Sequence, residues 1–416
     1  MKIAVISLGC KVNTCESESI ATKLRSLGHI VVNEFEKADA YIINTCAVTQ
    51  EAEKKSRQCV ARVRKYNKNA KIYIIGCASE KDPEQFLSKN AEYIGGTSFK
   101  EKVCDLPVGT DKEEIPETYE YMTYSDNSRT RAFVKIQDGC NNFCSYCIIP
   151  YVRGRSRSRA IDDILCECNL KALSTQEIVL TGINVSAYGV DIGTNLVNLV
   201  KALSSVNSRI RFSSLEVNVI TDQLLQAMKN AGNFCDHFHL SLQSGDNDVL
   251  KSMNRKYTRE EYMDKCNLIR KYFPFSAITT DIIVGFSTET DQAFENTYNL
   301  AESVRFADIH VFPYSRRAGT RAYSWKPVDP VTVKQREEKL LALKKELKRE
   351  FSESALGSTL EVLAEYKEGG FAEGYSKNYI RVYFNVDGEA QLGKIYSVKI
   401  TDLYKDGVKG EVVKLR

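Results

Sequence analysis

The sequence predicts an α/β protein in three parts: a parallel α/β domain, an open barrel of six strand-helix units and a small closed β-barrel. Three observations predict this order. Apolar runs alternate with helical stretches near the amino terminus, six strand and helix pairs recur between residues 126 and 330, and the last sixty residues are all-strand in pattern. A chain of 416 residues has room for about three domains. We expect their boundaries at 1–115, 126–352 and 353–416.

The first domain is expected to be a parallel sheet whose strand ends carry cysteines. Its strands are predicted over 3–8, 41–43 and 72–75, and helices over 16–26 and 51–65. Cys10, Cys46 and Cys77 each follow one of these strands. The carboxyl ends of parallel strands face one crevice, where open α/β sheets bind ligands.

A lone cysteine at such a place is more often a small buried hydrophobe than a ligand. Three of them at the same edge of one sheet make coincidence a poor explanation, so we predict that Cys10, Cys46 and Cys77 hold an auxiliary iron-sulfur cluster with one open iron. Cys15 lies close to Cys10 in sequence and is the alternative ligand, although a position on the following helix is expected for it.

The middle of the chain is expected to form a barrel that does not fully close. Enzymes built on such barrels place their active sites at the carboxyl ends of the strands. Gly182 follows the second predicted strand, Glu216 the third, and Gln243 and Ser244 the fourth. The six strands are predicted over 132–136, 177–180, 210–215, 237–242, 278–284 and 309–312, with helices that include 196–203 and 259–272.

Cys140, Cys144 and Cys147 follow the first barrel strand with the spacing C-x3-C-x2-C. Three thiolates in one short loop can hold three corners of a cubane iron-sulfur cluster and leave the fourth iron without a protein ligand. A structural zinc ion is the alternative. A structural zinc ion needs four ligands, usually in two pairs of closely spaced cysteines or histidines, and no second pair follows here.

A run of four arginines at alternate positions lies just beyond the cysteine loop. In an extended segment these side chains would form one basic face, which suits phosphates or a substrate carboxylate. The alternative is a solvated loop whose arginines pair with carboxylates such as Asp162 and Asp163. The four residues are Arg153, Arg155, Arg157 and Arg159.

The last part of the chain begins with a polar helix over 332–352, which we interpret as a solvated connection because its charges alternate in sign. Strands are then predicted over 360–364, 379–384, 396–400 and 410–413. Their size and their glycine breaks are typical of a small closed barrel of oligonucleotide-binding type. Its tyrosines and Phe371 could stack on bases or belong to the core.

The chain has neither a signal-peptide pattern nor an apolar run long enough to span a bilayer, so no membrane partner is predicted. Its 13 cysteines therefore indicate metal or redox chemistry in a reducing, cytoplasmic compartment rather than disulfides. A net charge of +4 neither requires nor excludes a nucleic-acid partner.

Taken together, these motifs resemble the radical S-adenosylmethionine (radical SAM) methylthiotransferase family over the whole chain. The resemblance implies an amino-terminal auxiliary-cluster domain, a radical SAM barrel and a carboxyl-terminal TRAM domain. It also implies two [4Fe-4S] clusters on the six cysteines and two molecules of SAM. The candidate SAM-binding residues are Gly182, Glu216, Gln243, Ser244, Arg255 and Asp281. The segments that carry the resemblance are 8–13, 16–18, 44–46, 76–77, 139–155, 180–182, 240–245, 253–255, 280–286 and 310–315.

Relatives in this family act on three substrates: tRNA with threonylcarbamoyl or with isopentenyl on adenosine 37, and an aspartate of a ribosomal protein. The sequence motifs of this chain at 9–13, 16–18 and 153–159 are most similar to those of the threonylcarbamoyl branch. Threonylcarbamoyl carries a carboxylate that an arginine can bind, so Arg153, Arg155 or Arg157 is expected to orient the base in the anticodon loop.

A different class of function stays open, that of a non-catalytic iron-sulfur protein that binds RNA or senses redox state. The sequence identifies neither the sulfur donor nor the electron donor.

Overall fold

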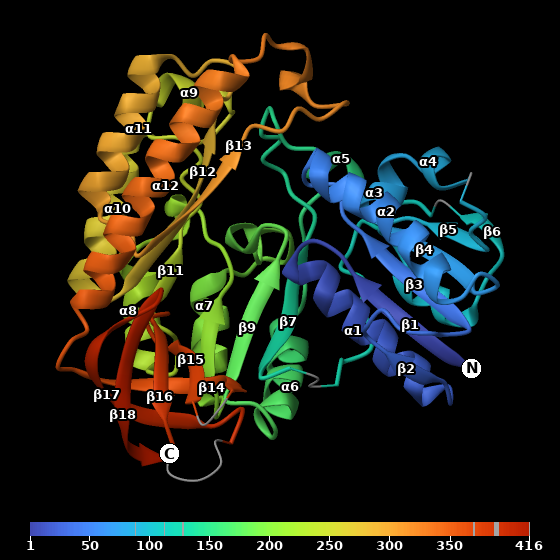
Figure 1. Cartoon of the computed structure of the whole chain (residues 1–416), viewed down its shortest axis with the longest axis horizontal. Coiled ribbons are helices and arrows are strands. Elements are labelled where there is room, and N and C mark those ends of the chain that lie inside the picture. Colours follow the sequence, from blue (N-terminus) through green and yellow to red (C-terminus); the bar gives the residue numbers. More distant parts are fainter. Residues whose placement is uncertain (88, 112, 127–128, 369–370, 387–390, 416) are drawn as a thin grey trace.

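The computed structural model describes residues 1–87, 89–111, 113–126, 129–368, 371–386 and 391–415. It has the three parts predicted, an amino-terminal α/β domain beside a barrel and a small all-strand barrel below it (Figure 1). The fold class is therefore confirmed. Within the described residues, no helix is long and apolar enough to cross a membrane.

The amino-terminal sheet has six strands in the order β2-β1-β3-β4-β5-β6, and every pairing in it is parallel. The three central strands match the apolar runs. The other three contain three residues each, which is too short for a periodic signal. The strands are β1 (Lys2–Ser7), β2 (Ile30–Val32), β3 (Ala40–Thr45), β4 (Lys71–Gly76), β5 (Tyr93–Gly95) and β6 (Gly109–Asp111).

Each of the three central strands turns into a helix at or close to a cysteine. Helix α1 (Lys11–Ser26) begins directly after Cys10, and α3 (Cys77–Lys81) begins at Cys77 itself. Helix α2 (Gln50–Tyr66) begins four residues after Cys46, where the Thr49 hydroxyl accepts a hydrogen bond from the Ala52 amide. The sheet topology therefore brings the three cysteines to one edge of the sheet.

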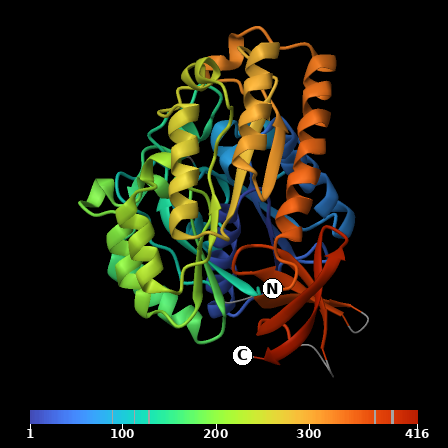
Figure 2. The same cartoon turned by 90° about the vertical axis from the view of Figure 1, so that its left-hand side faces the viewer.

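The barrel consists of two sheets, β10-β9-β7-β8 and β11-β12-β13. They meet where Leu215 pairs with Leu240, and among the described residues no strand pairing joins β13 to β7, so the barrel is open on that side. Helices cover its outer surface (Figure 2). The strands are β7 (Arg131–Asp138), β8 (Arg157–Ser158), β9 (Glu177–Gly182), β10 (Arg209–Phe212), β11 (His237–His239), β12 (Ala277–Val284) and β13 (Asp308–Pro313). The covering helices include α6 (Ile161–Ala172), α7 (Leu196–Ala202), α8 (Asp222–Ala231), α10 (Arg259–Tyr272) and α11 (Asp291–Val304).

The long polar helix α12 (Pro330–Glu353) is not only a solvated connection. Leu340, Leu343 and Leu347 are buried in the core of the barrel, and the buried guanidinium of Arg336 contacts Glu289 at 2.6 Å. One face of the helix therefore completes the barrel wall. Its apolar positions are spaced three and four residues apart, and they were obscured by the charged residues between them.

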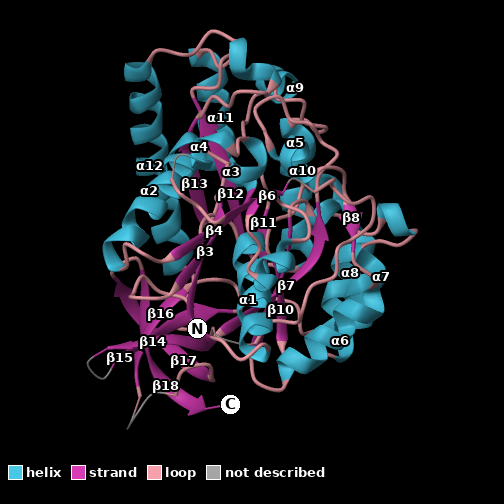
Figure 3. Ribbon diagram, turned by 90° about the vertical axis from the view of Figure 1, so that its right-hand side faces the viewer, coloured by secondary structure: helices cyan, strands magenta, loops and turns pink. Residues whose placement is uncertain are grey.

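The carboxyl-terminal domain is a closed barrel in the order β14-β15-β16-β18-β17 and lies at the lower end of the molecule (Figure 3). Tyr379 stacks on His237 of the large barrel with 4.4 Å between ring centres. Tyr379 therefore serves the contact between the two barrels rather than a free base-stacking surface, whereas Phe371 is 46% exposed. The strands are β14 (Thr359–Glu368), β15 (Phe371–Ser376), β16 (Arg381–Asn385), β17 (Ile395–Tyr404) and β18 (Gly407–Leu415), of which β15 was missed.

Candidate iron-sulfur and SAM site

All six candidate cluster ligands line a single cavity of about 270 Å³. The amino-terminal domain contributes one side of this cavity and the barrel the other. The sequence predicted the two groups of cysteines separately, and only the packing of the two domains brings them to one space. They are Cys10, Cys46, Cys77, Cys140, Cys144 and Cys147.

Close backbone packing positions the amino-terminal cysteines. Gly9 has φ +93°, and a Cβ placed on it would lie 2.5 Å from both Cβ and Sγ of Cys46. The side-chain amide of Asn13 donates hydrogen bonds to the carbonyl oxygens of Leu8 (2.8 Å) and Thr45 (2.9 Å), which joins the ends of β1 and β3. The residue before Cys10 therefore has to be glycine, both for its backbone angle and for the space beside Cys46.

We expect the substitution Gly9→Ala to lower the iron bound by the amino-terminal cysteines, because the new methyl group displaces Cys46. Gly28→Ala is the matched control, since Gly28 also has a positive φ (+84°) but has nothing within 4 Å of its Cβ position. Iron and sulfide per chain after anaerobic reconstitution measure the effect. Equal losses in both variants would assign the effect to backbone strain and contradict the packing argument.

The barrel cysteines lie on the loop between β7 and α5 (Ile149–Arg153). The side-chain amide of Asn254 donates to the carbonyl oxygens of Asn142 (2.9 Å) and Phe143 (3.1 Å), and so fixes the middle of the loop. The sulfurs of Cys140 and Cys144 accept from neighbouring donors at the cavity wall. Those donors are the Asn142 amide (3.5 Å) and the Asn184 side chain (3.7 Å) for Cys140, and the Arg255 guanidinium (3.5 Å) for Cys144.

The two groups of cysteines suit a larger group than a single ion. Four sulfurs around zinc lie about 3.8 Å apart, given Zn–S bonds of about 2.3 Å. Among the described residues, neither cysteine group brings its three sulfurs within 4.8 Å of one another. Burial raises the pKa of the Cys46 and Cys147 thiols to about 12 each, so metal binding has to displace their protons. The donor set fits a cubane cluster, and sulfurs this far apart disfavour the zinc alternative.

Four of the six candidate SAM-binding residues also line the cavity: Gly182, Glu216, Gln243 and Arg255. Arg255 and Glu216 form an ion pair at 2.9 Å. The other two candidates lie outside it. Ser244 is fully buried and contacts the Thr297 hydroxyl at 3.3 Å, and Asp281 pairs with two histidines. The lining residues that the sequence did not reveal as site residues include Asn13, Asn142, Tyr146, Ser214 and Ser241.

Cys15 is not part of the cavity. It lies on α1 with its sulfur 3.7 Å from the carbonyl oxygen of Phe133, and it is only 5% exposed. A helix turns by about 100° per residue, so Cys15 faces away from the direction of Cys10. This geometry disfavours Cys15 as a replacement ligand for Cys10.

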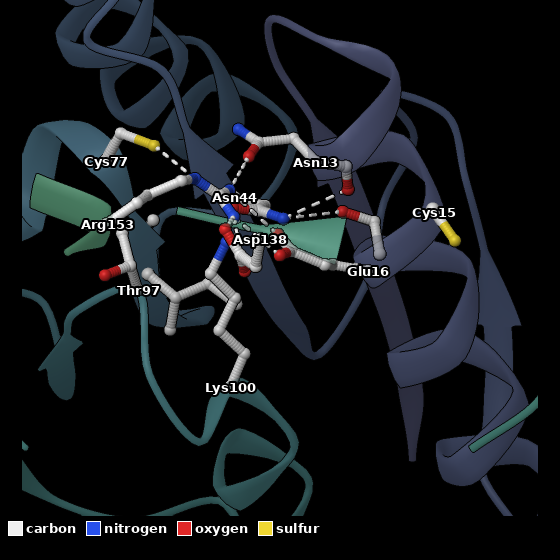
Figure 4. Close-up of polar contacts among 12 residues, drawn as sticks. Asn13, Cys15, Glu16, Asn44, Cys77, Thr97, Lys100, Asp138 and Arg153 are labelled. Atoms are coloured by element: carbon white, nitrogen blue, oxygen red, sulfur yellow. Dashed lines mark hydrogen bonds and ion pairs between the residues drawn. The ribbon is translucent and has the colours of Figure 1, made fainter. Parts of the chain in front are cut away.

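Arg153 joins the two halves of the site (Figure 4). It ends α5, its side chain has no exposed surface, and its Nε donates to the sulfur of Cys77 at 3.2 Å. The guanidinium also donates to both carboxylate oxygens of Glu16 (2.9 and 3.1 Å) and both of Asp138 (3.1 Å each). One side chain from the barrel therefore contacts a cysteine of the amino-terminal domain, helix α1 and the strand that leads to Cys140.

The charges around Arg153 form a closed network. Lys100 and Lys135 also pair with Glu16, and Lys135 pairs with Asp138 at 2.6 Å. Burial alone would raise the pKa of Glu16, but Arg153, Lys100 and Lys135 hold it well below its ordinary value. Arg157 also lies 4.0 Å from Asp138, so four cations face two carboxylates here and the network has an excess of positive charge beside the Cys77 sulfur. That charge favours a negatively charged, metal-bound sulfur.

The prediction of one basic face along the arginine run is wrong. Arg153, Arg157 and Arg159 are all buried, because α5 and the short strand β8 turn them into the protein. Arg157 donates to the carbonyl oxygens of Arg153 (3.0 Å) and Arg155 (2.8 Å), and Arg159 pairs with Asp163 and Glu167. Only Arg155 is exposed, with its guanidinium 4.6 Å above the ring of Phe143.

Comparison with known families gives two matches along the chain. The model of the radical SAM superfamily matches residues 134–301, and the model described as uncharacterized protein family UPF0004 matches residues 2–95. The first match contains the barrel cysteines and the second contains the amino-terminal ones.

Curated relatives match over nearly the whole chain. The threonylcarbamoyladenosine tRNA methylthiotransferase MtaB of Bacillus subtilis is 36% identical over 96% of this chain and 93% of its own length. The protein of the same name from Thermotoga maritima is 35% identical over 98% and 96%. The tRNA-2-methylthio-N(6)-dimethylallyladenosine synthase of a Thermoanaerobacter species is also 35% identical, over 98% and 92%.

Solved structures share the fold at low sequence identity. The radical S-adenosylmethionine methyltransferase TsrM from Kitasatospora setae aligns with a TM-score of 0.57 and 10% identity, over 77% of this chain and 76% of that one. The cobalamin-dependent radical enzyme OxsB aligns with a TM-score of 0.54 and 11% identity, over 84% and 56%. At these identities the likeness concerns the fold alone.

Proposed function

We propose a substrate and a division of labour for the two cysteine groups of this chain, which belongs to the radical SAM methylthiotransferase family. The proposed reaction places a methylthio group on N6-threonylcarbamoyladenosine at position 37 of tRNA. The observation that carries it is the single cavity on which both cysteine groups meet. A cavity shared by two clusters allows sulfur transfer and radical formation to occur within reach of one substrate atom.

Each cysteine group has its own task in this proposal. When bound, the two [4Fe-4S] clusters and two SAM molecules supply a methylated sulfur and a carbon radical that removes hydrogen from the substrate. Cys10, Cys46 and Cys77 hold the auxiliary cluster, and Cys140, Cys144 and Cys147 hold the one that binds SAM for cleavage. The Arg255 and Glu216 pair and the backbone at Gly182 and Gln243 give SAM charged and polar partners at the barrel mouth.

The threonylcarbamoyl substrate is supported by the names of the MtaB relatives and by an exposed arginine. Arg155 lies beside the cysteine loop, and among the described residues no hydrogen bond or ion pair involves its guanidinium. Phe143 and the half-exposed Tyr151 contact each other next to it, with 5.5 Å between ring centres. The two aromatic rings could stack on a splayed base. The cation suits the carboxylate of that base or the phosphate of its nucleotide.

We expect Arg155→Ala to raise KM for threonylcarbamoylated tRNA about tenfold or more, because one charge-assisted contact to an anion is lost. SAM cleavage without tRNA should stay at the wild-type rate, since Arg155 does not line the cavity. The two activities are measured on the same preparation. Arg157→Ala is not a usable comparison, because Arg157 holds backbone carbonyls inside the protein. Unchanged tRNA turnover in Arg155→Ala would refute the substrate contact.

Parallel incubations distinguish the three substrate classes of the family. The cluster-loaded protein is given SAM, sulfide and a reductant without oxygen, together with threonylcarbamoylated tRNA, isopentenylated tRNA or ribosomal protein. Mass spectrometry of the products should show methylthio addition to the first substrate only. Product on another substrate would redirect the assignment. Absence of SAM cleavage in every incubation would instead favour the non-catalytic iron-sulfur protein.

A further inference from the structure

Three of the four histidines in the chain lie together on strands of the large barrel, and none of them lines the cysteine cavity. His237 and His239 belong to β11 and His310 to β13, on either side of β12. Asp281 of β12 is the registered partner of His310. Neighbouring strands in register point such side chains to the same face. The barrel sheet therefore gathers imidazoles and one carboxylate at a single place.

The ligand atoms of His239, Asp281 and His310 converge. His239 Nε2 lies 3.1 Å from one oxygen of Asp281, and His310 Nδ1 lies 3.1 Å from the other. All three ligand atoms lie within 4.8 Å of one another, and this is the one such group among the described residues. Metal–ligand bonds of about 2.1 Å place adjacent ligand atoms about 3.0–3.4 Å apart, so each nitrogen–oxygen separation of 3.1 Å matches that of adjacent ligands on one ion.

A second layer of hydrogen bonds orients His239. Its Nδ1 lies 2.9 Å from the Thr279 hydroxyl, whose oxygen also lies 3.0 Å from His237 Nε2. If His239 Nδ1 donates to Thr279, the Thr279 hydroxyl can donate to His237, and Nε2 of His239 keeps its lone pair toward Asp281. Metal-binding histidines are commonly held in this way through their second nitrogen.

Charge and access complete the argument. Among the described residues, both carboxylate oxygens of Asp281 have histidine partners, which are neutral when they act as ligands, so the carboxylate charge then lacks a balancing cation. His239 is buried, whereas the His310 side chain is 51% exposed at the open edge of the barrel, which gives an entry path. None of the three residues lines the cysteine cavity.

We propose that His239, Asp281 and His310 bind one divalent transition-metal ion, separate from the iron-sulfur clusters. Two imidazoles and one carboxylate are the ligands that zinc and ferrous iron prefer, and they leave coordination positions open. The alternative is a hydrogen-bonded triad in which Asp281 only orients the two rings. Both arrangements use the same three side chains, and they differ in whether a metal ion binds with one equivalent per chain.

Zinc binding to the full-length, cluster-loaded protein separates the two arrangements. Equilibrium dialysis against micromolar zinc without oxygen, followed by elemental analysis, should give about one more zinc per chain in the wild type than in Asp281→Asn. This variant keeps the size of Asp281 and one of its two acceptor oxygens but removes its charge. His310→Gln should lose the same equivalent, and it changes a half-exposed side chain whose loss spares the core.

His29→Ala is the matched control, because His29 is the remaining histidine and lies in the amino-terminal domain. It should bind as much zinc as the wild type. All preparations are compared at equal iron content, so that empty cysteine sites do not add zinc. Equal zinc content in wild type, Asp281→Asn and His310→Gln would overturn the proposal and leave the hydrogen-bonded triad. Neither result depends on tRNA turnover, so this test of metal binding is independent of the proposed function.

Discussion

Replacing Cys46 by alanine is expected to abolish methylthio transfer while SAM cleavage continues, whereas Cys144→Ala is expected to abolish both. The two cysteines belong to different groups on the same cavity. Each group has three sulfurs, and loss of one leaves too few ligands to hold a cubane cluster. In the proposed mechanism the radical is formed at the barrel group, so only the second variant is expected to stop SAM cleavage.

Iron analysis and product analysis measure this pair of variants. The iron content of each variant should be about four atoms per chain, against about eight in the wild type, as expected when one of two four-iron clusters is lost. Cys59→Ala is the control, because Cys59 is buried in α2 among apolar residues of the amino-terminal core and does not line the cavity. Methylthio transfer by Cys46→Ala, or iron loss in Cys59→Ala, would contradict the assignment of the two groups.

Replacing Arg153 by methionine is expected to lower the free energy of unfolding by about 3–5 kcal/mol. The substitution keeps most of the side-chain volume but removes the guanidinium that donates to both carboxylate oxygens of Glu16 and to both of Asp138. Glu16 is 1% exposed and Asp138 is 6% exposed, so water cannot replace the lost contacts. Lys100 and Lys135 still face these carboxylates and reduce the loss without removing it.

Chemical denaturation of the full chain without iron measures this effect apart from cluster loading. Arg155→Met is the matched control. It makes the same replacement two residues further along the chain, at an arginine whose side chain is exposed. It should change the free energy of unfolding by about 0.5 kcal/mol or less. If both variants lose the same stability, the Arg153 network is not the contact that holds the two domains together.

The order of elements could be predicted because strands and helices leave periodic signals. The central strands of the amino-terminal sheet are mostly buried apolar runs, and parallel topology alone was enough to place Cys10, Cys46 and Cys77 at one edge. The spacing of the barrel cysteines fixed the second group in the same way. Both cysteine groups could therefore be predicted from the sequence, without knowing how the two domains pack.

The failures have a common physical cause, which is packing between segments far apart in sequence. Arg153 appeared to belong to a basic surface, but its partners Glu16 and Asp138 lie on α1 and β7, and they draw it into the interior. Asp281 was expected at SAM, yet its register with His310 turns it toward the histidines. No local pattern encodes such pairings.

One measurement tests the central claim most directly. Threonylcarbamoylated tRNA is incubated without oxygen with the cluster-loaded protein, sulfide, a reductant and SAM whose methyl group is deuterated, and its nucleosides are analysed by mass spectrometry. The account predicts a 2-methylthio derivative whose methyl group carries all three deuterium atoms. SAM cleavage with unchanged nucleosides on all candidate substrates, or a labelled methyl group without added sulfur, would contradict it.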